Sequence, residues 1–414
     1  MKSRYVTAVI IILFAGTIKD ARANSNDIQS AIRNSHRLYF PGELLVKFKA
    51  HTPARATKSI HTDFGISGFR HGYNEHFQII EVPPGQEKEI AQAYRKRPEV
   101  EYAEPNYYRS LHSTPNDELY TYQWHLPLIN LPEAWDITAG ENVTVAVIDS
   151  GVSPFGRDSF GERLLRGYNA IFRIPGGIDF ANHGTHVAGT IGQETNNRTG
   201  VAGIAYQANI LPVTSLLALT GSGLDSWIID SIMWATDQGA DIINMSLGGS
   251  LPSKAMEDAV NYAYERGVTV VASSGNDGEN DVAFPAAYEN CIAVGAVRFD
   301  KTVTSYSNRG SALDLVAPGG DMDADQNNDG EPDCILQETF WWFGINWGYW
   351  WFAGTSMASP HVAGVAALIK AVHPEFGPDE IRMVLEETAE DLGEPGWDQT
   401  YGYGLIDASA AVSY

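Results

Sequence analysis

Apolar and polar positions divide the chain into segments of two kinds. Short, mostly apolar runs predict strands at residues 44–48, 77–82, 100–102, 143–148, 241–245 and 268–272. Longer segments of helical composition predict helices at residues 86–97, 227–238, 255–266, 359–372 and 378–387. Because strands and helices alternate through most of the chain, we expect an α/β fold.

The alternation is interrupted at residues 105–122, which contain two prolines and show little periodicity. Before this stretch, the predicted strands and helix suffice for a small α/β domain at about residues 43–107. After it, residues 143–148 form a nearly continuous apolar run, as in a parallel strand covered on both faces. We therefore expect a second, larger domain built on a doubly wound, mostly parallel sheet flanked by helices.

The first 23 residues have the pattern of a secretory signal peptide. Lys2 and Arg4 give a positive start, residues 7–18 form an apolar run, and Ala21-Arg22-Ala23 offers small residues for cleavage. The run is shorter than the ~20 residues that a membrane-spanning helix needs, and an uncleaved anchor is the alternative. We expect a secreted product, extracellular or, if it crosses only an inner membrane, periplasmic, with no membrane contact after cleavage.

Charge separates the two parts of the chain. The formal net charge is −23 at pH 7; residues 113–414 hold 12 Lys and Arg against 40 Asp and Glu, whereas residues 24–112 hold 12 against 10. This balance argues against nucleic acid as a partner, because phosphate binding needs a basic face. An acidic surface supports solubility, and some of the acids are candidates for binding a cation.

The chain has two cysteines, Cys291 and Cys334. In an exported protein they could form one disulfide. The alternative is a pair of buried free thiols, because nothing in the sequence places the two close together.

Three segments carry the groups needed for nucleophilic catalysis by a serine. A hydroxyl is a weak nucleophile at neutral pH and needs an imidazole as base, which in turn needs a carboxylate to orient it. Asp149 ends a strand-like run, and His183 opens His-Gly-Thr-His-Val-Ala-Gly at a helix start. Ser356 lies in Gly-Thr-Ser-Met-Ala-Ser-Pro-His, at a turn that opens a long helix. We therefore expect Asp149, His183 and Ser356 to form a catalytic triad.

These three segments, in this order, resemble those of the subtilisin-like serine proteases, the subtilase family. The resemblance runs from about Asp117 to the C-terminus and includes Gly402-Tyr403-Gly404-Leu405-Ile406. It implies a subtilisin-like fold and a serine endopeptidase that acts through an acyl-enzyme. It also implies that His183 is the base and that His186 is a buried structural residue.

The resemblance extends to groups around the triad. It implies that Asn276 and the Ser356 N–H donate to the oxyanion. Substrate is then expected to pair as an added strand with Ser246-Leu247-Gly248 and with an opposing edge that includes Gly223. Two other classes of function stay open, a serine hydrolase acting on esters and a catalytically inactive subtilase-fold binding protein.

Residues 43–107 resemble, less closely, the inhibitor-type propeptide domain of this family. The likeness lies in Leu44-Leu45-Val46-Lys47-Phe48 and in residues 100–106. It implies a propeptide at residues 24–112, which assists folding and inhibits the active site, and a catalytic domain at residues 113–414. We expect self-cleavage between about Arg109 and Thr114. The expected partners are protein or peptide substrates and the chain's own propeptide, and the mature enzyme is expected to be a monomer.

Two sets of oxygen-bearing residues are candidates for structural calcium, and no organic cofactor is expected. The first set follows the start of an EF-hand loop, with alternating ligands before Gly330, and departs from it at Leu336, where a bidentate Glu is expected. It consists of Asp325, Asn327 and Asp329, with Asp333 as a replacement for that Glu. The family resemblance implies the second set, which consists of Asp117, Asp158 and Asn197. An apparent one-residue insertion near Asn197 is a departure from the family pattern, and a solvated acidic loop is the alternative for the first set.

Two features leave the substrate preference open. The acidic segment at residues 277–281 could favour basic side chains. Residues 340–352 hold five Trp and directly precede Gly354. That segment could be a hydrophobic wall of the cleft, a docking patch, or packing for the calcium loop.

Overall fold

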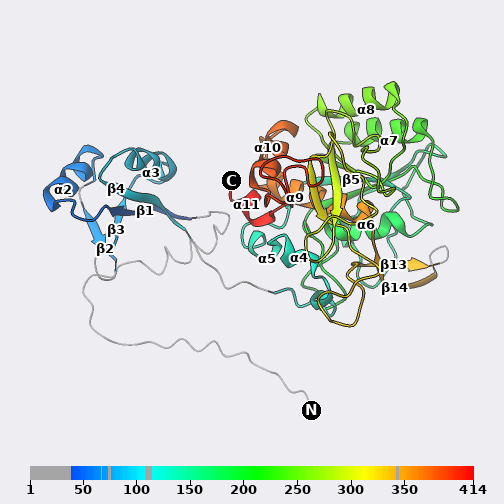
Figure 1. The fold of residues 1–414 in the computed structure, drawn as a ribbon, viewed down its shortest axis with the longest axis horizontal. Helices are drawn as coiled ribbons and strands as arrows, with labels where there is room; N and C mark the ends of the chain where they lie inside the picture. The colour runs from blue at the N-terminus through cyan, green and yellow to red at the C-terminus, as the bar shows by residue number, and fades with distance from the viewer. Residues whose placement is uncertain (1–38, 67, 73–75, 108–113, 342–344) are drawn as a thin grey trace, which may run out of the picture. The chain divides into compact units, whose positions relative to one another are not determined.

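The computed structural model describes residues 39–66, 68–72, 76–107, 114–341 and 345–414. The chain divides into two compact units, Met1–Arg109 and Ser110–Tyr414 (Figure 1). The expected signal peptide and most of the expected cleavage segment lie outside the described residues.

The first unit is a four-stranded antiparallel sheet with two helices, and its strand order is β2-β3-β1-β4. Its elements are β1 (Tyr39–Phe48), α2 (Ala54–Asp63), β2 (Phe69–His71), β3 (Gln78–Glu81), α3 (Glu87–Arg95) and β4 (Val100–Tyr107). Leu44 and Val46 alternate with less buried residues along β1, so one face of the strand enters the core. They pack with Ile80 and Tyr94 in a core that belongs to this unit alone. The small α/β domain expected from the sequence is therefore present.

The second unit is built on an eight-stranded sheet with the order β12-β11-β10-β9-β5-β8-β6-β7. Its strands are β5 (Thr144–Asp149), β6 (Tyr168–Asn169), β7 (Ile174–Pro175), β8 (Asn209–Thr214), β9 (Ile242–Met245), β10 (Thr269–Ser273), β11 (Ile292–Val297) and β12 (Leu315–Pro318). Every pairing is parallel except that of β6 with β7. The doubly wound, mostly parallel sheet is thereby confirmed.

Helices cover both faces of this sheet (Figure 1). They are α4 (His125–Leu128), α5 (Leu131–Ala134), α6 (His183–Gly192), α7 (Asp225–Asp237), α8 (Lys254–Tyr264), α9 (Thr355–Val372), α10 (Pro378–Thr388) and α11 (Ala408–Val412). A two-stranded hairpin, β13 (Ile335–Trp341) and β14 (Ile345–Phe352), directly precedes α9. α6 packs with α9, and α7 packs with α8.

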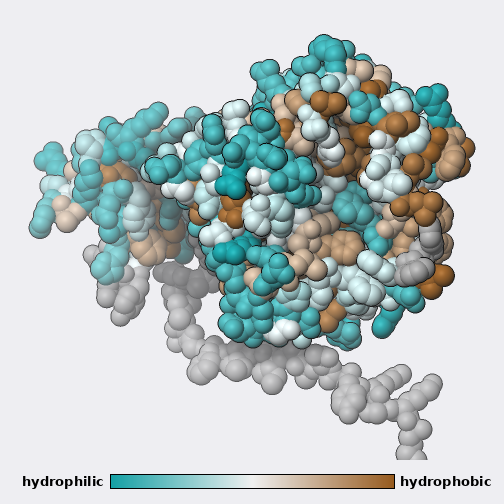
Figure 2. Space-filling model, turned by 45° about the vertical axis from the view of Figure 1, so that its right-hand side comes forward, coloured by the Kyte–Doolittle hydropathy of each residue, from teal (hydrophilic) through white to brown (hydrophobic). Residues whose placement is uncertain are grey.

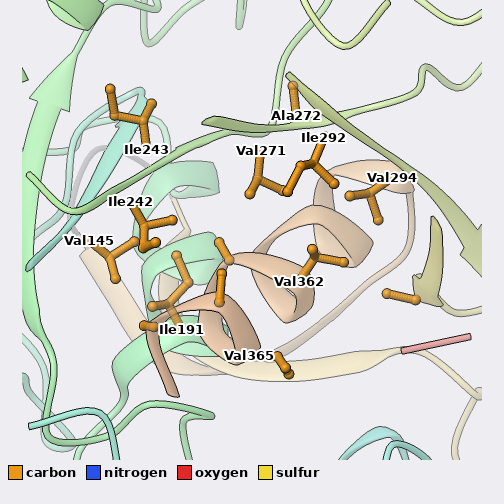
Figure 3. Close-up of a cluster of buried hydrophobic side chains, with 14 of the residues drawn as sticks. Val145, Ile191, Ile242, Ile243, Val271, Ala272, Ile292, Val294, Val362 and Val365 are labelled. Atoms are coloured by element: carbon orange, nitrogen blue, oxygen red, sulfur yellow. The ribbon is translucent and has the colours of Figure 1, made fainter. Parts of the chain in front are cut away.

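The core of the second unit forms between the sheet and α9. Figure 3 shows Val362 on the side of α9 that is nearer to Val271 of β10 and Val365 on the other side of the helix, while Ala272 next to Val271 points to the opposite face of the sheet. All four side chains are fully buried, so this central strand is covered on both sides. Burying one side chain of this size contributes roughly 1.5–3 kcal/mol. Among the residues described, no helix combines the length and the apolar character needed to cross a bilayer.

The strand order places the reversal of the winding at β5. After β5 the chain passes through α6 to β8 on one side, and later through α7 to β9 on the other side. In sheets of this kind the ligand site lies outside the carboxyl ends of the strands, at the point of reversal. Asp149 is the last residue of β5, so the fold places its carboxylate at that point.

Cys291 and Cys334 are both buried free thiols. The disulfide that the sequence left open is therefore absent from this structure, and the free-thiol alternative holds. Burial raises the pKa of the Cys334 thiol to about 12, so this thiol stays protonated and unreactive at neutral pH.

Candidate active site

Asp149, which is buried, and His183, which is half-buried, form a hydrogen-bonded pair at the end of β5. His183 Nδ1 lies 2.9 and 3.0 Å from the two carboxylate oxygens of Asp149. Because a carboxylate can only accept, Nδ1 carries the proton and Nε2 is left to take up another. Burial lowers the pKa of His183, but the charge and hydrogen bond of Asp149 outweigh it and hold that pKa above its ordinary value. The pair has the arrangement of a general base and the group that orients it.

The start of α6 is fixed by Asp179, a buried residue that the sequence analysis missed. Its carboxylate accepts four hydrogen bonds from residues 181–185, two of them from Thr185. The close packing of α6 on β5 also needs Gly184, where a Cβ would lie only 2.1 Å from the Gly151 carbonyl oxygen. An Asp shortly before a predicted helix start is a capping signal, and it could have pointed to this residue.

Ser356 lies in the first turn of α9, half-buried, and its hydroxyl donates to the Ser246 carbonyl oxygen at 3.2 Å. A serine hydroxyl rotates freely, and catalytic hydrogen bonds are often long before substrate binds. The backbone of Ser356 is held from the same side. Pro360 has no N–H to offer the Ser356 carbonyl oxygen, and the Ser246 hydroxyl donates to that oxygen instead, at 2.7 Å.

The sequence motif implies that Ser246 binds substrate, but its side chain contacts the helix turn that carries Ser356 instead. Its side chain is buried, and it accepts hydrogen bonds from Asn244 Nδ2 at 3.1 Å and from Ser359 Oγ at 2.9 Å. The hydroxyl holds the helix turn that carries Ser356, while only the backbone of Ser246 remains for substrate. The structure thus makes its side chain a positioning group.

We expect Ser246→Ala to lower kcat about tenfold with little change in KM. The variant removes one hydrogen bond to the turn that carries Ser356, a loss of about 1.4 kcal/mol. Steady-state kinetics on a short chromogenic peptide would measure it, with Ser413→Ala, which alters an exposed serine at the end of α11, as the matched control. A rise in KM at unchanged kcat would contradict the positioning role.

Asn276 follows β10 and faces the start of α9. Its Oδ1 accepts from the Thr355 N–H at 2.8 Å and from the Thr355 hydroxyl at 2.9 Å, so its Nδ2 remains as a donor. A Cβ on Gly354, whose φ is +151°, would lie 3.7 Å from Asn276 Nδ2 and 3.7 Å from Ser356 N. The Asn276 carboxamide and the Ser356 N–H therefore lie on the same side of this turn, which makes them candidates for the two donors that an oxyanion needs.

Two further histidines lie near the pair but are bound within the core. His186 Nε2 lies 3.1 Å from the carbonyl oxygens of Ile335 and Trp350, and burial lowers the pKa of this histidine to about 3. His361 Nδ1 donates to the Met357 carbonyl oxygen at 2.8 Å, and burial lowers its pKa to about 4. Both stay neutral and have no exposed nitrogen, so His183 is the base that the geometry supports.

Two extended segments border these groups. Beyond the end of β9, Leu247 is half-buried and Gly248 is exposed. The segment that includes Gly223 starts next to Asp149, because the Ser215 N–H donates to the Asp149 carbonyl oxygen at 2.8 Å. A Cβ on Gly223 would lie 2.4 Å from the Ser215 carbonyl oxygen, so this position needs glycine. Both segments therefore start at a residue that contacts the triad.

The acidic loop at residues 325–333 turns its oxygens inward. Asp325 Oδ1 accepts from the Asp329 N–H at 3.1 Å, and Asn327 Oδ1 accepts from the same N–H at 2.9 Å. Asp333 is fully buried, and its Oδ1 has no hydrogen-bond partner. Burial and the charges of Asp325 and Asp329 raise the pKa of Asp333. Across the described residues, no three Asp, Glu, His or Cys side chains are arranged so that they could hold a metal ion.

The residues of the second expected set are joined by hydrogen bonds, although the same limit on metal-holding groups applies to them. The Asp117 carboxylate accepts from the Asn197 N–H at 3.2 Å, and Asn197 Nδ2 donates to Asp158 Oδ1 at 2.8 Å. The hairpin adds Glu338, which accepts from the Asp158 N–H at 2.9 Å and which the sequence did not indicate. Burial, aided by the charges of Glu338 and Asp117, raises the pKa of Asp158 to about 7. A cation would relieve this repulsion among buried carboxylates.

Comparison with known proteins agrees with this geometry. Residues 140–404 match the model of the Subtilase family, and residues 25–106 match that of the fervidolysin N-terminal prodomain. The chain belongs to the subtilase family. It is a serine-type endopeptidase with a prodomain of the fervidolysin type. The family resemblance and the fold seen in the sequence are thereby confirmed.

Individual relatives of this subtilase cover most of the chain. It is 38% identical over 393 residues to the thermophilic serine proteinase of Bacillus sp. strain AK1, which covers 93% of this chain and 91% of the relative. A protease structure from Pseudoalteromonas arctica PAMC 21717 has a TM-score of 0.66 and 36% identity over 73% of this chain and 99% of that one. Fervidolysin from Fervidobacterium pennivorans has a TM-score of 0.64 and 28% identity over 91% of this chain but only 61% of its own.

Proposed function

We propose that this subtilase is an extracellular endopeptidase, made as a precursor whose own active site removes the prodomain. The observation that carries the proposal is the buried Asp149, bonded to His183 Nδ1 at 2.9 Å at the reversal point of the sheet. Two relatives support the location by their names, the minor extracellular protease Epr of Bacillus subtilis and the halolysin-like extracellular serine protease Nep of Natrialba magadii.

In the proposed reaction Ser356 Oγ attacks the scissile carbonyl carbon while His183 Nε2 takes the hydroxyl proton. Asp149 stabilises the imidazolium that forms, and Asn276 Nδ2 and the Ser356 N–H donate to the oxyanion. The C–N bond then breaks as the imidazolium gives its proton to the leaving amine. Water, deprotonated by His183, hydrolyses the acyl-enzyme and restores Ser356.

The substrate of this reaction is an extended polypeptide. We infer that it pairs with the backbone of Ser246-Leu247-Gly248 on one side and with the edge that includes Gly223 on the other. The exposed Gly248 supports this, because it lets another backbone approach closely. An ester hydrolase would not need two strand-forming edges.

Labelling with a fluorophosphonate, together with assays on casein and on a short-chain nitrophenyl ester, tests the proposed function. We expect the label on Ser356, no labelling of His183→Ala, and cleavage of casein. Ester hydrolysis without casein cleavage would favour the esterase alternative. Absence of labelling and of both activities would favour an inactive binding protein.

The first unit has the role of an intramolecular inhibitor in this proposal. Residues 24–112 form the propeptide, and cleavage between about Arg109 and Thr114 releases the catalytic domain at residues 113–414. A separate core within the first unit supports this, since the unit can stay folded after the cut. Its C-terminal tail would occupy the active site as a product-like strand.

We infer that this subtilase binds structural calcium. At residues 325–333 the buried, unpartnered Oδ1 of Asp333 offers an oxygen to a cation, and Asp325, Asn327 and Asp329 offer more. Asp117, Asp158 and Asn197 would hold a second ion. Calcium at either place binds the folded chain and so stabilises it.

Removing calcium is expected to lower the Tm of the mature enzyme. A hundredfold excess of calcium over Kd adds about 2.7 kcal/mol of stability, or roughly 5 °C in a domain of this size. Asp333→Asn should lose the part of that shift due to the loop, whereas Asp323→Asn, which alters an exposed acid just before the loop, should keep it. Scanning calorimetry with and without a chelator would show this, and an unchanged calcium shift in Asp333→Asn would rule the loop site out.

A further inference from the structure

The β13–β14 hairpin exposes large apolar side chains that the triad does not use. Trp341, Ile345 and Trp350 are 44%, 64% and 37% exposed, and the rings of Trp341 and Trp350 lie 5.6 Å apart. Phe155 and Phe180, from two neighbouring segments, are 63% and 53% exposed. We call these five residues the aromatic surface. Figure 2 shows apolar side chains gathered at the right-hand edge of the molecule. Such a gathering on a soluble protein marks an interaction site.

The hairpin is fixed to the start of α6. The Thr339 hydroxyl donates to the carbonyl oxygen of Asn182, the residue before His183, at 2.6 Å. His186, one helical turn after His183, donates from Nε2 to the Trp350 carbonyl oxygen at 3.1 Å. The backbone around Trp350 is therefore held beside the helix turn that carries the base.

The hairpin is fixed equally to the loop that follows Asp149. Glu338 accepts from the Arg157 N–H at 2.8 Å, and a Cβ on Gly156 would lie 3.1 Å from a ring carbon of Trp347. Phe155 is thereby placed next to the hairpin. The segments that carry Phe155 and Phe180 are thus each joined to the hairpin by a hydrogen bond within two residues of the exposed ring.

From these contacts we infer that the aromatic surface lies on the leaving-group side of the site. His183 must pass its proton to the leaving amine, so the chain beyond the scissile bond runs past the start of α6. The acyl side of the substrate is held elsewhere, at residues 246–248 and at Gly223. An extended chain advances about 3.3 Å per residue, so two to four residues beyond the cut suffice to pass one helical turn and reach the hairpin.

We propose that the aromatic surface binds apolar and aromatic side chains of the substrate, two to four residues beyond the scissile bond on the leaving-group side. The proposal rests on the endopeptidase function proposed above. Aromatic side chains of a substrate gain binding free energy on such a surface, because their apolar area is buried and their rings contact the rings of the enzyme. The five residues carry no charge and the catalytic domain is acidic, so aromatic segments are favoured over acidic ones at these positions.

Three substrates that share one acyl side test the proposal: a quenched fluorescent peptide with aromatic residues at positions two to four beyond the cut, a second with Gly and Ser there, and a p-nitroanilide. We expect the wild-type enzyme to cleave the aromatic peptide with about tenfold higher kcat/KM than the Gly-Ser peptide, mainly through KM. In Trp341→Ser/Trp350→Ser the ratio should fall to about one. Met383→Ser, which alters an exposed apolar residue on α10, should keep the wild-type ratio.

Two results would overturn the proposal. One is a wild-type enzyme with no preference between the two peptides. The other is a double variant that loses the same factor on all three substrates, because the hairpin would then support the triad and bind nothing itself. If the Trp341/Trp350 double variant does not fold, the ratio of kcat/KM on the two peptides is measured with Phe155→Ser/Phe180→Ser, which alters two other segments of the same surface. A wild-type enzyme that cleaves none of the three would count against the endopeptidase function itself.

Discussion

Replacing Ser356 by alanine is expected to leave the chain at precursor length and to abolish peptide hydrolysis. Loss of the triad serine costs about a millionfold in kcat in subtilisin, and the same groups surround Ser356 here. Without its hydroxyl, His183 has no nucleophile to activate, so neither added substrate nor the junction between the two units can be acylated.

Expression of Ser356→Ala without any other protease, followed by intact-mass measurement, gives the result directly. Ser413→Ala, which alters an exposed serine at the end of α11, should process normally and serves as the control. Adding a trace of wild-type mature enzyme should then cut the variant precursor between about Arg109 and Thr114, which tests the junction separately from the chemistry. A product of mature size from Ser356→Ala alone would show that self-processing is wrong.

The sequence predicted those helices and strands that bury a whole face, because burial leaves a long run or a regular period of apolar residues in the sequence. α9 and β5 are nearly continuous apolar segments, so their positions follow from composition. β8 was missed because Pro212 interrupts it and proline is unusual inside a sheet, although Pro212 pairs with Val147. α2 was missed because Ile60 is its one buried large apolar residue, too few for a helical period.

The hairpin shows another limit of sequence reasoning. Residues 340–352 look like an aromatic insertion broken by glycines, yet β13 and β14 pair antiparallel from Ile335 with Phe352 to Trp341 with Ile345. Packing of the hairpin against α6 decides which aromatic rings of the hairpin stay exposed. The spacing of residues in the sequence does not reveal that packing. The hairpin does pack on the segment after Asp149, since Glu338 of β13 accepts a hydrogen bond from the Asp158 N–H, but this contact involves neither residues 340–352 nor the acidic loop, so all three roles of residues 340–352 stay predictions. The proposed aromatic surface corresponds to the first of these roles, a hydrophobic wall of the cleft.

The motifs predicted which residues meet at the site, but not the atoms that face one another. The hydroxyl of Ser246 donates to Ser356 from 110 positions away, and such a contact exists only in the folded chain. Asp179 is the opposite case, because it satisfies nearby N–H groups of a helix start and its capping signal is visible in the sequence. Long-range hydrogen bonding is therefore the part of the site that sequence alone could not provide.

Replacing Asn276 by leucine is expected to lower kcat by about 10²–10³ with KM nearly unchanged, the range found when one oxyanion donor is removed from subtilisin. Leucine has a similar shape but no N–H, so the developing negative charge keeps the Ser356 N–H as its donor. Substrate in the ground state has no such charge, and its binding should be largely unaffected. Steady-state kinetics would show the split between kcat and KM, with Asn280→Leu as the control.

The carboxamide of Asn276 also holds Thr355 through Oδ1, so a second variant must separate the two roles. Asn276→Asp keeps an acceptor for the Thr355 N–H, at 2.8 Å in the native chain, but removes the donor and adds a negative charge near the oxyanion. If donation matters, Asn276→Asp should be at least as slow as Asn276→Leu. If holding Thr355 matters instead, Asn276→Asp should recover most of the native rate, and the oxyanion role of Asn276 would then be wrong.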